Sequence, residues 1–151
     1  VHELGLQALW FWPNPDAGTD DISKGIRRFR EHNKTPQIRF VIDIHPRDFV
    51  ALAREAKCIV GNSSGGIKEA SFFGTPVVNI GSRQQGRARG ENVSDVGYDK
   101  EEIKSAIEKQ IAHERYQPSL IYYKPDTAER IVDILKTVPL YTQKRFHDVA
   151  A

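Results

Sequence analysis

The chain has 151 residues, of which 39% are hydrophobic and 28% charged, and its formal net charge at pH 7 is +2. This composition fits one globular domain and excludes a disordered polyelectrolyte. The nearly balanced charge gives no reason to expect nucleic acid as a partner, and no apolar stretch is long enough for a membrane span. The single cysteine, Cys58, excludes an internal disulfide, so we expect a reducing, cytoplasmic location and an inert, buried thiol.

Strand-like and helix-like apolar patterns alternate along the first third of the chain. Residues 6–12 form a continuous apolar run that Pro13 ends, as a buried strand would. Residues 20–30 place apolar side chains at the spacing of one helical face. Strict alternation over residues 38–44 predicts a second strand, and Pro46 is well placed to open a second helix.

The same alternation continues through the rest of the sequence. Asp99 and Glu102 have the spacing of a capping box, which predicts a helix that begins after Asp99. The other predicted elements are a strand over 58–60, a helix over 64–73, a strand over 76–80 and a helix over 128–135. Strands alternating with helices of this length predict an α/β fold, a Rossmann-like parallel sheet with helices on both faces.

In such sheets, ligands bind beyond the carboxyl ends of the strands, and the strongest signal there is residues 61–70 (GNSSGGIKEA). Backbone N–H groups at a helix start and the hydroxyls of Ser63 and Ser64 can donate to a phosphate, which glycines such as Gly65 allow to approach closely. An ordinary serine cap with a glycine-rich turn explains the loop equally well. The loop matches neither the Walker phosphate loop nor the dinucleotide fingerprint, which disfavours ATP hydrolysis and NAD binding.

Charged residues lie both in this segment and after the next predicted strand. Arg83, Arg87 and Arg89 follow the next predicted strand and could neutralise a diphosphate, or could form a solvated basic loop. Glu69 lies one turn into the predicted helix. Its carboxylate could accept from ribose hydroxyls, or could pair at the surface with Lys68 or Arg83.

No acid–base or metal constellation is evident in the sequence. None of the five histidines has another His, Cys or carboxylate at a metal-ligand spacing, so we expect neither a metal nor a cofactor. His45 falls in the expected cleft, and a helix cap explains it at least as well. With no Ser-His-Asp set and no carboxylate pair, we assign no catalytic residue and interpret the chain as a binding domain.

Four segments come in the order, and near the spacing, of one protein family: residues 13–18 (PNPDAG), 61–70, 73–87 (FGTPVVNIGSRQQGR) and 90–93 (GENV). Together they resemble the C-terminal half of a UDP-N-acetylglucosamine 2-epimerase, over residues 6–135. The likeness is greatest to the hydrolysing branch, because non-hydrolysing members usually carry an acidic pair where residues 68–70 stand. The family implies a GT-B architecture, in which two Rossmann-like domains hold a nucleotide sugar between them.

The resemblance implies that residues 1–151 form the UDP-binding domain, with a set of contacts to the phosphates. Ser63 and Ser64 would donate to the diphosphate beside Gly65. Arg83 would face the nucleotide, and Asn14 would lie near the phosphates or the sugar. The expected ligands are therefore UDP and a UDP-acetamido sugar.

At the nucleoside end, Glu69 would accept from the ribose hydroxyls, and uracil would rest against Phe49 with the backbone of Ile44 at its edge. The family's reaction removes the C2 proton, expels UDP to leave a glycal, and adds water to give N-acetylmannosamine or an analogue for sialic-acid-type synthesis. The family's carboxylates and catalytic His belong to the N-terminal half. Because the chain also lacks Met, we expect about half of an enzyme, inactive alone.

The resemblance also implies which partners the chain has. The N-terminal domain of the same protein is the expected partner, in a full-length homodimer. Residues 139–151 form either a crossover helix to that domain or a frayed end.

Three alternatives remain: half of a UDP-dependent GT-B glycosyltransferase, a sugar-phosphate-binding domain of the isomerase type, and a Rossmann-like domain without a ligand. The stretch 83–92 favours the epimerases over the first of these.

Overall fold

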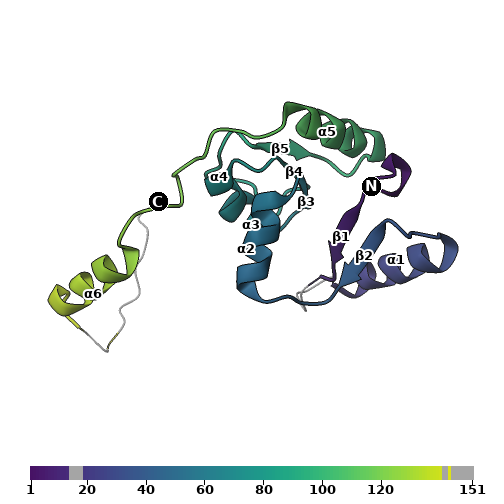
Figure 1. The fold of residues 1–151 in the computed structure, drawn as a ribbon. Helices are drawn as coiled ribbons and strands as arrows, with labels where there is room; N and C mark the ends of the chain where they lie inside the picture. Colours follow the sequence, from purple (N-terminus) through teal and green to yellow (C-terminus); the bar gives the residue numbers. More distant parts are fainter. Residues whose placement is uncertain (14–18, 141–142, 144–151) are drawn as a thin grey trace, which may run out of the picture.

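The computed structural model describes residues 1–13, 19–140 and 143 and has an α/β fold in which every described strand pair is parallel (Figure 1). This confirms the predicted fold class. The strands form two sheets instead of one, with the orders β1-β2 and β3-β4-β5. The strands are β1 (Ala8–Phe11), β2 (Ile38–Val41), β3 (Ile59–Gly61), β4 (Val77–Ile80) and β5 (Val93–Val96).

The helices begin where the capping signals indicate. Asp99 accepts a hydrogen bond from the Glu102 N–H at 2.9 Å and caps α5. Pro46 opens α2, and the His45 ring accepts from the Arg47 N–H at 3.3 Å, so His45 is a helix cap. The helices are η1 (His2–Leu4), α1 (Thr19–His32), α2 (Pro46–Glu55), α3 (Ser64–Ile67), α4 (Glu69–Phe73), α5 (Lys100–His113) and α6 (Thr127–Thr137).

Beyond shifts of one or two residues at element ends, three features differ from the prediction. The helix predicted over 64–73 is divided at Lys68 into α3 and α4, although Lys68 keeps α-region angles of φ −91° and ψ −66°. Strand β2 ends at Val41, since Ile42 turns into solvent with 83% of its surface exposed. Strand β5 was not predicted, because its sequence, VSDV, has no clear alternation.

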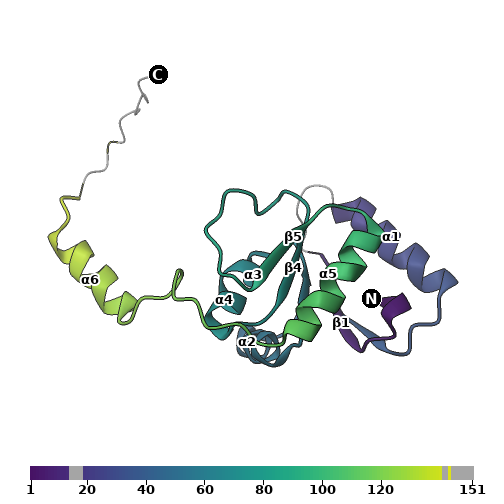
Figure 2. The same ribbon diagram turned by 90° about the horizontal axis from the view of Figure 1, so that it is seen from above.

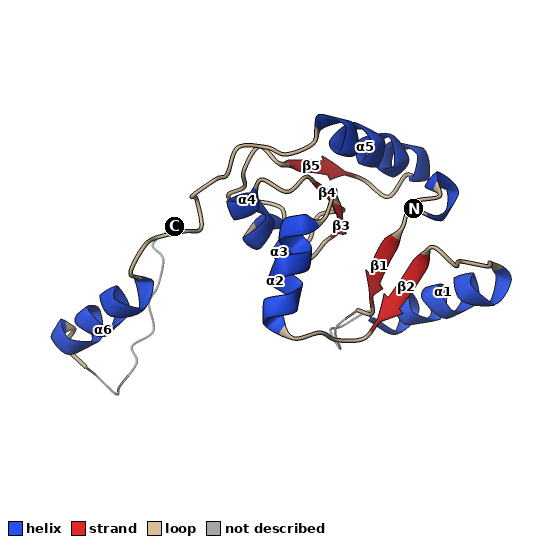
Figure 3. Ribbon diagram, in the orientation of Figure 1, coloured by secondary structure: helices blue, strands red, loops and turns tan. Residues whose placement is uncertain are grey.

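The hydrophobic core lies on both faces of the three-stranded sheet. Val78 packs on one face with Val96 of β5 and with Ile107 of α5. Val77 points to the other face, where α3 approaches so closely that a Cβ on Gly66 would lie 3.1 Å from a Val77 methyl carbon. Helix α5 and helices α2 to α4 therefore cover opposite sides of this sheet (Figures 2 and 3).

A buried polar network holds the chain that leaves α5. Gln110 of α5 donates to the Val77 carbonyl at 2.8 Å and accepts from the Tyr116 hydroxyl at 2.7 Å. The backbone N–H of Tyr116 donates to the Gly74 carbonyl at 2.9 Å, and that of Ser119 donates to the Ser71 carbonyl at 2.9 Å. These bonds satisfy buried polar groups and fasten residues 114–119 against the end of α4.

Beyond residue 119 the chain leaves the sheets, and α6 stands apart from them (Figures 1 and 2). The predicted helix is present, yet every described residue from 120 to 140 is exposed, including Ile131, Val132 and Leu135 on its apolar face. Pro139 and Leu140 have no regular structure, and most of the predicted tail lies outside the described residues. Among the described helices, none has the length and hydropathy to cross a membrane.

Candidate functional site

The loops that follow β3 and β4 are joined to each other. The Gln84 side chain, 2% exposed, donates from Nε2 to the Asn62 carbonyl at 2.7 Å. The carboxyl ends of these two strands therefore form one shared edge, as expected for adjacent parallel strands. Any ligand at residues 61–66 would also lie near residues 81–84.

At the start of α3, Ser63 is the cap. Its hydroxyl oxygen accepts from the Gly65 N–H at 3.3 Å, so the ordinary serine cap is present. A hydroxyl that accepts one hydrogen bond still carries a proton that it can donate. Ser64 is the first residue of α3 and is half-buried. Capping the helix and contacting a phosphate are therefore compatible roles for this pair.

Three of the predicted site residues, from three successive helices, meet at Gly65. A Cβ on Gly65 would lie 3.0 Å from Cζ of Phe49 and 3.6 Å from Oε2 of Glu69. Phe49 is half-buried and also meets Phe11 edge-on, with 6.0 Å between the ring centroids. An aromatic ring and an exposed carboxylate thus stand side by side at the carboxyl end of β3, next to Ser63.

Two predicted contacts remain, that of the Ile44 backbone with the base edge and that of Asn14 with the phosphates or the sugar. The Ile44 N–H donates to the Asp43 carboxylate at 2.8 Å, which leaves the Ile44 carbonyl as the backbone group to meet a base edge. Asn14 lies outside the described residues. The prediction for Asn14 thus remains a prediction.

The structure separates the three arginines that the sequence groups together. Arg89 forms an ion pair with Asp95 and donates from Nη2 to the Gln84 carbonyl at 2.7 Å, so its charge serves to hold the loop. Arg83 and Arg87 are exposed in the same loop. Arg83 lies three residues after the end of β4 and is the arginine nearest in sequence to the shared edge.

Two buried amides beneath this loop were not predicted from the sequence. Asn79 of β4 donates to the Asp95 carboxylate at 2.7 Å. Its Oδ1 and the Oε1 of Gln84 are buried and have no hydrogen-bond partner in the described structure. The one signal for Asn79 was a polar residue inside an otherwise apolar strand, and Gln84 had none.

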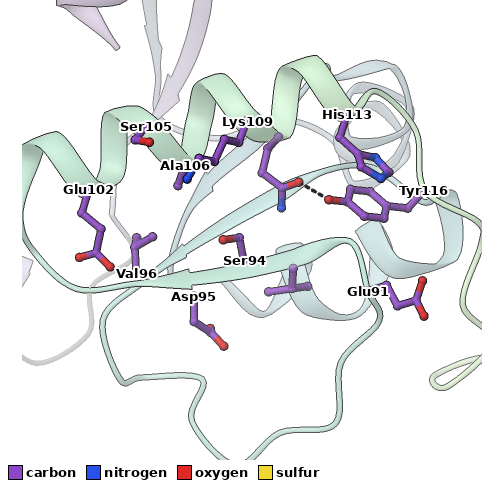
Figure 4. A pocket seen from close by; sticks show the side chains of 12 residues that line it. Glu91, Ser94, Asp95, Val96, Glu102, Ser105, Ala106, Lys109, His113 and Tyr116 are labelled. Carbon is purple, nitrogen blue, oxygen red and sulfur yellow. Dashed lines mark hydrogen bonds between the residues drawn. The ribbon is translucent and has the colours of Figure 1, made fainter.

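A cavity of about 500 Å³ lies elsewhere, between β5 and α5 (Figure 4). Tyr116 stacks there on His113 with 3.7 Å between the ring centroids, and the Glu102 carboxylate accepts from the Gly97 N–H at 3.0 Å. None of the predicted site residues lines it. Within the described part of the chain, no group of His, Cys, Asp and Glu is placed to hold a metal ion.

Comparison with known proteins gives matches over most of the chain. A family model described as UDP-N-acetylglucosamine 2-epimerase matches residues 2–136. A UDP-N,N'-diacetylbacillosamine 2-epimerase (hydrolyzing) of Legionella pneumophila is 34% identical over 138 residues, which cover 91% of this chain and 36% of that protein. A UDP-N-acetylglucosamine 2-epimerase of Neisseria meningitidis is 29% identical, over 96% of this chain and 39% of that protein. The chain thus spans less than two fifths of the length of these curated relatives.

Proposed function

Because this chain belongs to the UDP-N-acetylglucosamine 2-epimerase family, we propose that it is the UDP-binding domain of a hydrolysing epimerase. The full-length enzyme would convert UDP-N-acetylglucosamine, or a related UDP-acetamido sugar, to UDP and N-acetylmannosamine or its analogue. The contact of Phe49 with Gly65 beside the Glu69 carboxylate carries the proposal. It brings together an aromatic surface for a base and an acceptor for ribose hydroxyls.

The geometry supports a definite orientation for UDP. Uracil would pack against Phe49, since an aromatic side chain offers a large apolar surface to a planar base. The ribose would then reach Glu69, whose carboxylate accepts hydrogen bonds and donates none. The diphosphate would lie toward Ser63 and Ser64 at the start of α3, where backbone N–H groups favour an anion.

Arg83 would complete the charge balance of this site. A guanidinium near the shared edge could form charge-assisted hydrogen bonds with the diphosphate. The resemblance to the family assigns the ligand contact to Arg83, and the bonds of Arg89 to Asp95 and to the Gln84 carbonyl give Arg89 a structural role.

In the reaction, a base removes the proton from C2 while the C1–O bond breaks and UDP leaves as an anion. Water then adds across the resulting C1=C2 bond and places OH at C1 and H at C2. The new C2 hydrogen lies on the face opposite to the one from which the original C2 proton was removed. This chain would bind and neutralise the leaving UDP, and the N-terminal part would supply the base. We therefore expect the 151-residue chain to bind UDP without turning substrate over.

Titration calorimetry of the 151-residue chain with UDP tests the nucleotide site, with GDP and glucosamine 6-phosphate as competing ligands. Glu69→Gln should weaken UDP binding by about 1.5–3 kcal/mol, because hydrogen bonds to a charged group are lost. Glu108→Gln, on the exposed side of α5, should leave binding unchanged. Equal binding of GDP, or equal effects of the two variants, would contradict the proposed site.

The alternatives give different outcomes in the same measurement. Preference for glucosamine 6-phosphate would favour an isomerase-type sugar-phosphate domain. Sugar transfer to an acceptor by the full-length protein would favour a glycosyltransferase. From the resemblance we further propose that the full-length enzyme is a cytoplasmic homodimer serving sialic-acid-type synthesis, which light scattering and product analysis would test.

A further inference from the structure

Gln84 is buried in a loop whose other residues are exposed. Within residues 82–88, which follow β4, every residue except Gln84 is exposed, whereas Gln84 is 2% exposed. A glutamine side chain is seldom fully buried, because its amide must then exchange its bonds with water for bonds within the protein. The burial of Gln84 therefore calls for a reason that its neighbours do not need.

Burial satisfies only one half of the Gln84 amide. Its Nε2 donates to the Asn62 carbonyl at 2.7 Å, and its Oε1 is buried without a hydrogen-bond partner in the described structure. The opposite orientation of the amide would set Oε1 against the Asn62 carbonyl, so the donor must face Asn62. A buried acceptor without a donor lowers stability. The bond to Asn62 is therefore what the side chain offers in return for its burial.

The backbone of Gln84 is tied to the three-stranded sheet. Arg89 donates from Nη2 to the Gln84 carbonyl at 2.7 Å and forms an ion pair with Asp95 of β5. Asp95 also accepts from the Asn79 amide of β4 at 2.7 Å. Since β4 and β5 pair directly, Gln84 is anchored to a regular part of the fold. Its side chain can thus hold whatever it contacts in a fixed position relative to the sheet.

The group that Gln84 holds leads directly into the proposed phosphate contacts. The Asn62 carbonyl belongs to the peptide bond that joins Asn62 to Ser63. The hydroxyl of Ser63 in turn accepts from the Gly65 N–H at 3.3 Å and caps α3. Fixing this peptide bond therefore fixes where Ser63 and Ser64 place their hydroxyls.

We propose that Gln84 is a positioning residue for the diphosphate of the ligand. It holds the peptide bond before Ser63 so that the hydroxyls of Ser63 and Ser64 meet the phosphates without rearrangement. This inference rests on the proposed function, since it concerns the same ligand. The unbonded group of Gln84 is an acceptor oxygen, which would repel a phosphate, so Gln84 acts through its neighbours. A half-satisfied buried amide is the kind of local cost that proteins retain at functional sites.

The nucleoside half of the proposed site does not depend on this link. Phe49 and Glu69 meet at Gly65, whereas among the described residues the Gln84 side chain bonds to Asn62 alone. Loss of the bond should therefore weaken the binding of ligands that carry phosphate. It should spare uridine, which has the base and the ribose of UDP and no phosphate.

NMR titrations of Gln84→Met with UDP and with uridine test the proposal. Methionine keeps the length and the approximate volume of the side chain and removes both amide groups. Affinity for UDP should fall about 5-fold, as for one lost hydrogen bond, and affinity for uridine should stay within about 2-fold. Gln84→Leu should give the same pattern. Gln85→Met, at the exposed neighbouring position, is the matched control and should leave both affinities unchanged.

The ligand-free chain supplies a second measurement. In the spectrum of Gln84→Met, the backbone amide resonances of Ser63, Ser64 and Gly65 should shift, and that of Phe49 should not. Unshifted resonances at 63–65, an unchanged affinity for UDP, or equal losses for UDP and uridine would each overturn the proposal, because a merely structural role weakens both ligands alike. Absence of UDP binding by the unaltered chain would instead contradict the proposed function, and the positioning role with it.

Discussion

Helices α5 and α6 have similar sequence patterns and opposite surroundings. Helix α5 buries Ala106, Ile107 and Gln110 against the three-stranded sheet, whereas none of the described residues of α6 is buried. Both helices have an apolar face with helical periodicity. The difference teaches that periodicity predicts the existence of such a face and leaves open what covers it, which depends on the chain topology.

The largest expected effect probes the packed region at the end of α4. Gly74 has φ +65°, and a Cβ there would lie 2.0 Å from the Tyr116 carbonyl oxygen. Gly74→Ala should lower the free energy of unfolding by about 3 kcal/mol or more, because backbone strain is added to a backbone clash. Urea denaturation of the 151-residue chain measures this loss.

Gly5 provides the matched control in the peripheral region. It has the same φ of +65°, and a Cβ there meets nothing within 4 Å. Gly5→Ala should cost only the strain of the left-handed conformation, about 1–2 kcal/mol. Equal losses at the two glycines would show that the Tyr116 segment yields easily, and the contrast between the regions would disappear.

An intermediate loss of stability is expected when an apolar side chain of α5 is truncated, and the same change in α6 provides the direct comparison. Ile107 is 2% exposed and Leu135 is 58% exposed. Ile107→Ala should destabilise the chain by about 3 kcal/mol, because it leaves a cavity in the core, and Leu135→Ala should stay within about 0.5 kcal/mol. Thermal and urea denaturation measure both. A comparable loss for Leu135→Ala in the 151-residue chain would mean that α6 packs there after all.

The smallest loss of stability is expected when a single tyrosine hydroxyl is removed, either from the packed region or from the exposed one. The Tyr116 hydroxyl donates to the buried Gln110 at 2.7 Å, and burial raises the pKa of Tyr116 above its ordinary value. The exposed Tyr122 hydroxyl donates to the Ala88 carbonyl at 2.6 Å. Tyr116→Phe should cost about 1 kcal/mol, since it leaves the Gln110 oxygen without a donor, and Tyr122→Phe less than about 0.5 kcal/mol. Indistinguishable losses in urea denaturation would contradict this assignment.

Local signals were sufficient for much of the fold. Capping chemistry located α2 at Pro46 and α5 after Asp99, and apolar spacing located α1 and α6. Strand β5 escaped prediction because it is held by pairing with β4 and by the bond from Asn79 to Asp95, neither of which leaves an apolar pattern. The division of the sheet is a matter of long-range topology and has no local signal.

The candidate site was predictable to a similar extent. The sequence placed Ser63, Gly65 and Glu69 on one loop and helix start, and the resemblance added Phe49, which the structure brings against Gly65. The structural role of Arg89 could not be predicted. It depends on the position of Asp95, which is fixed only when β4 and β5 pair.

Cys58, the chain's single cysteine, directly precedes β3 and packs on the core. Burial raises the pKa of its thiol to about 11. At pH 8 roughly one molecule in a thousand would therefore carry the reactive thiolate. Partial burial and the raised pKa slow alkylation of the native chain, so a faster rate would report opening of this part of the sheet. The protein thus contains its own chemical reporter of local unfolding, directly before β3, and no substitution is needed to use it.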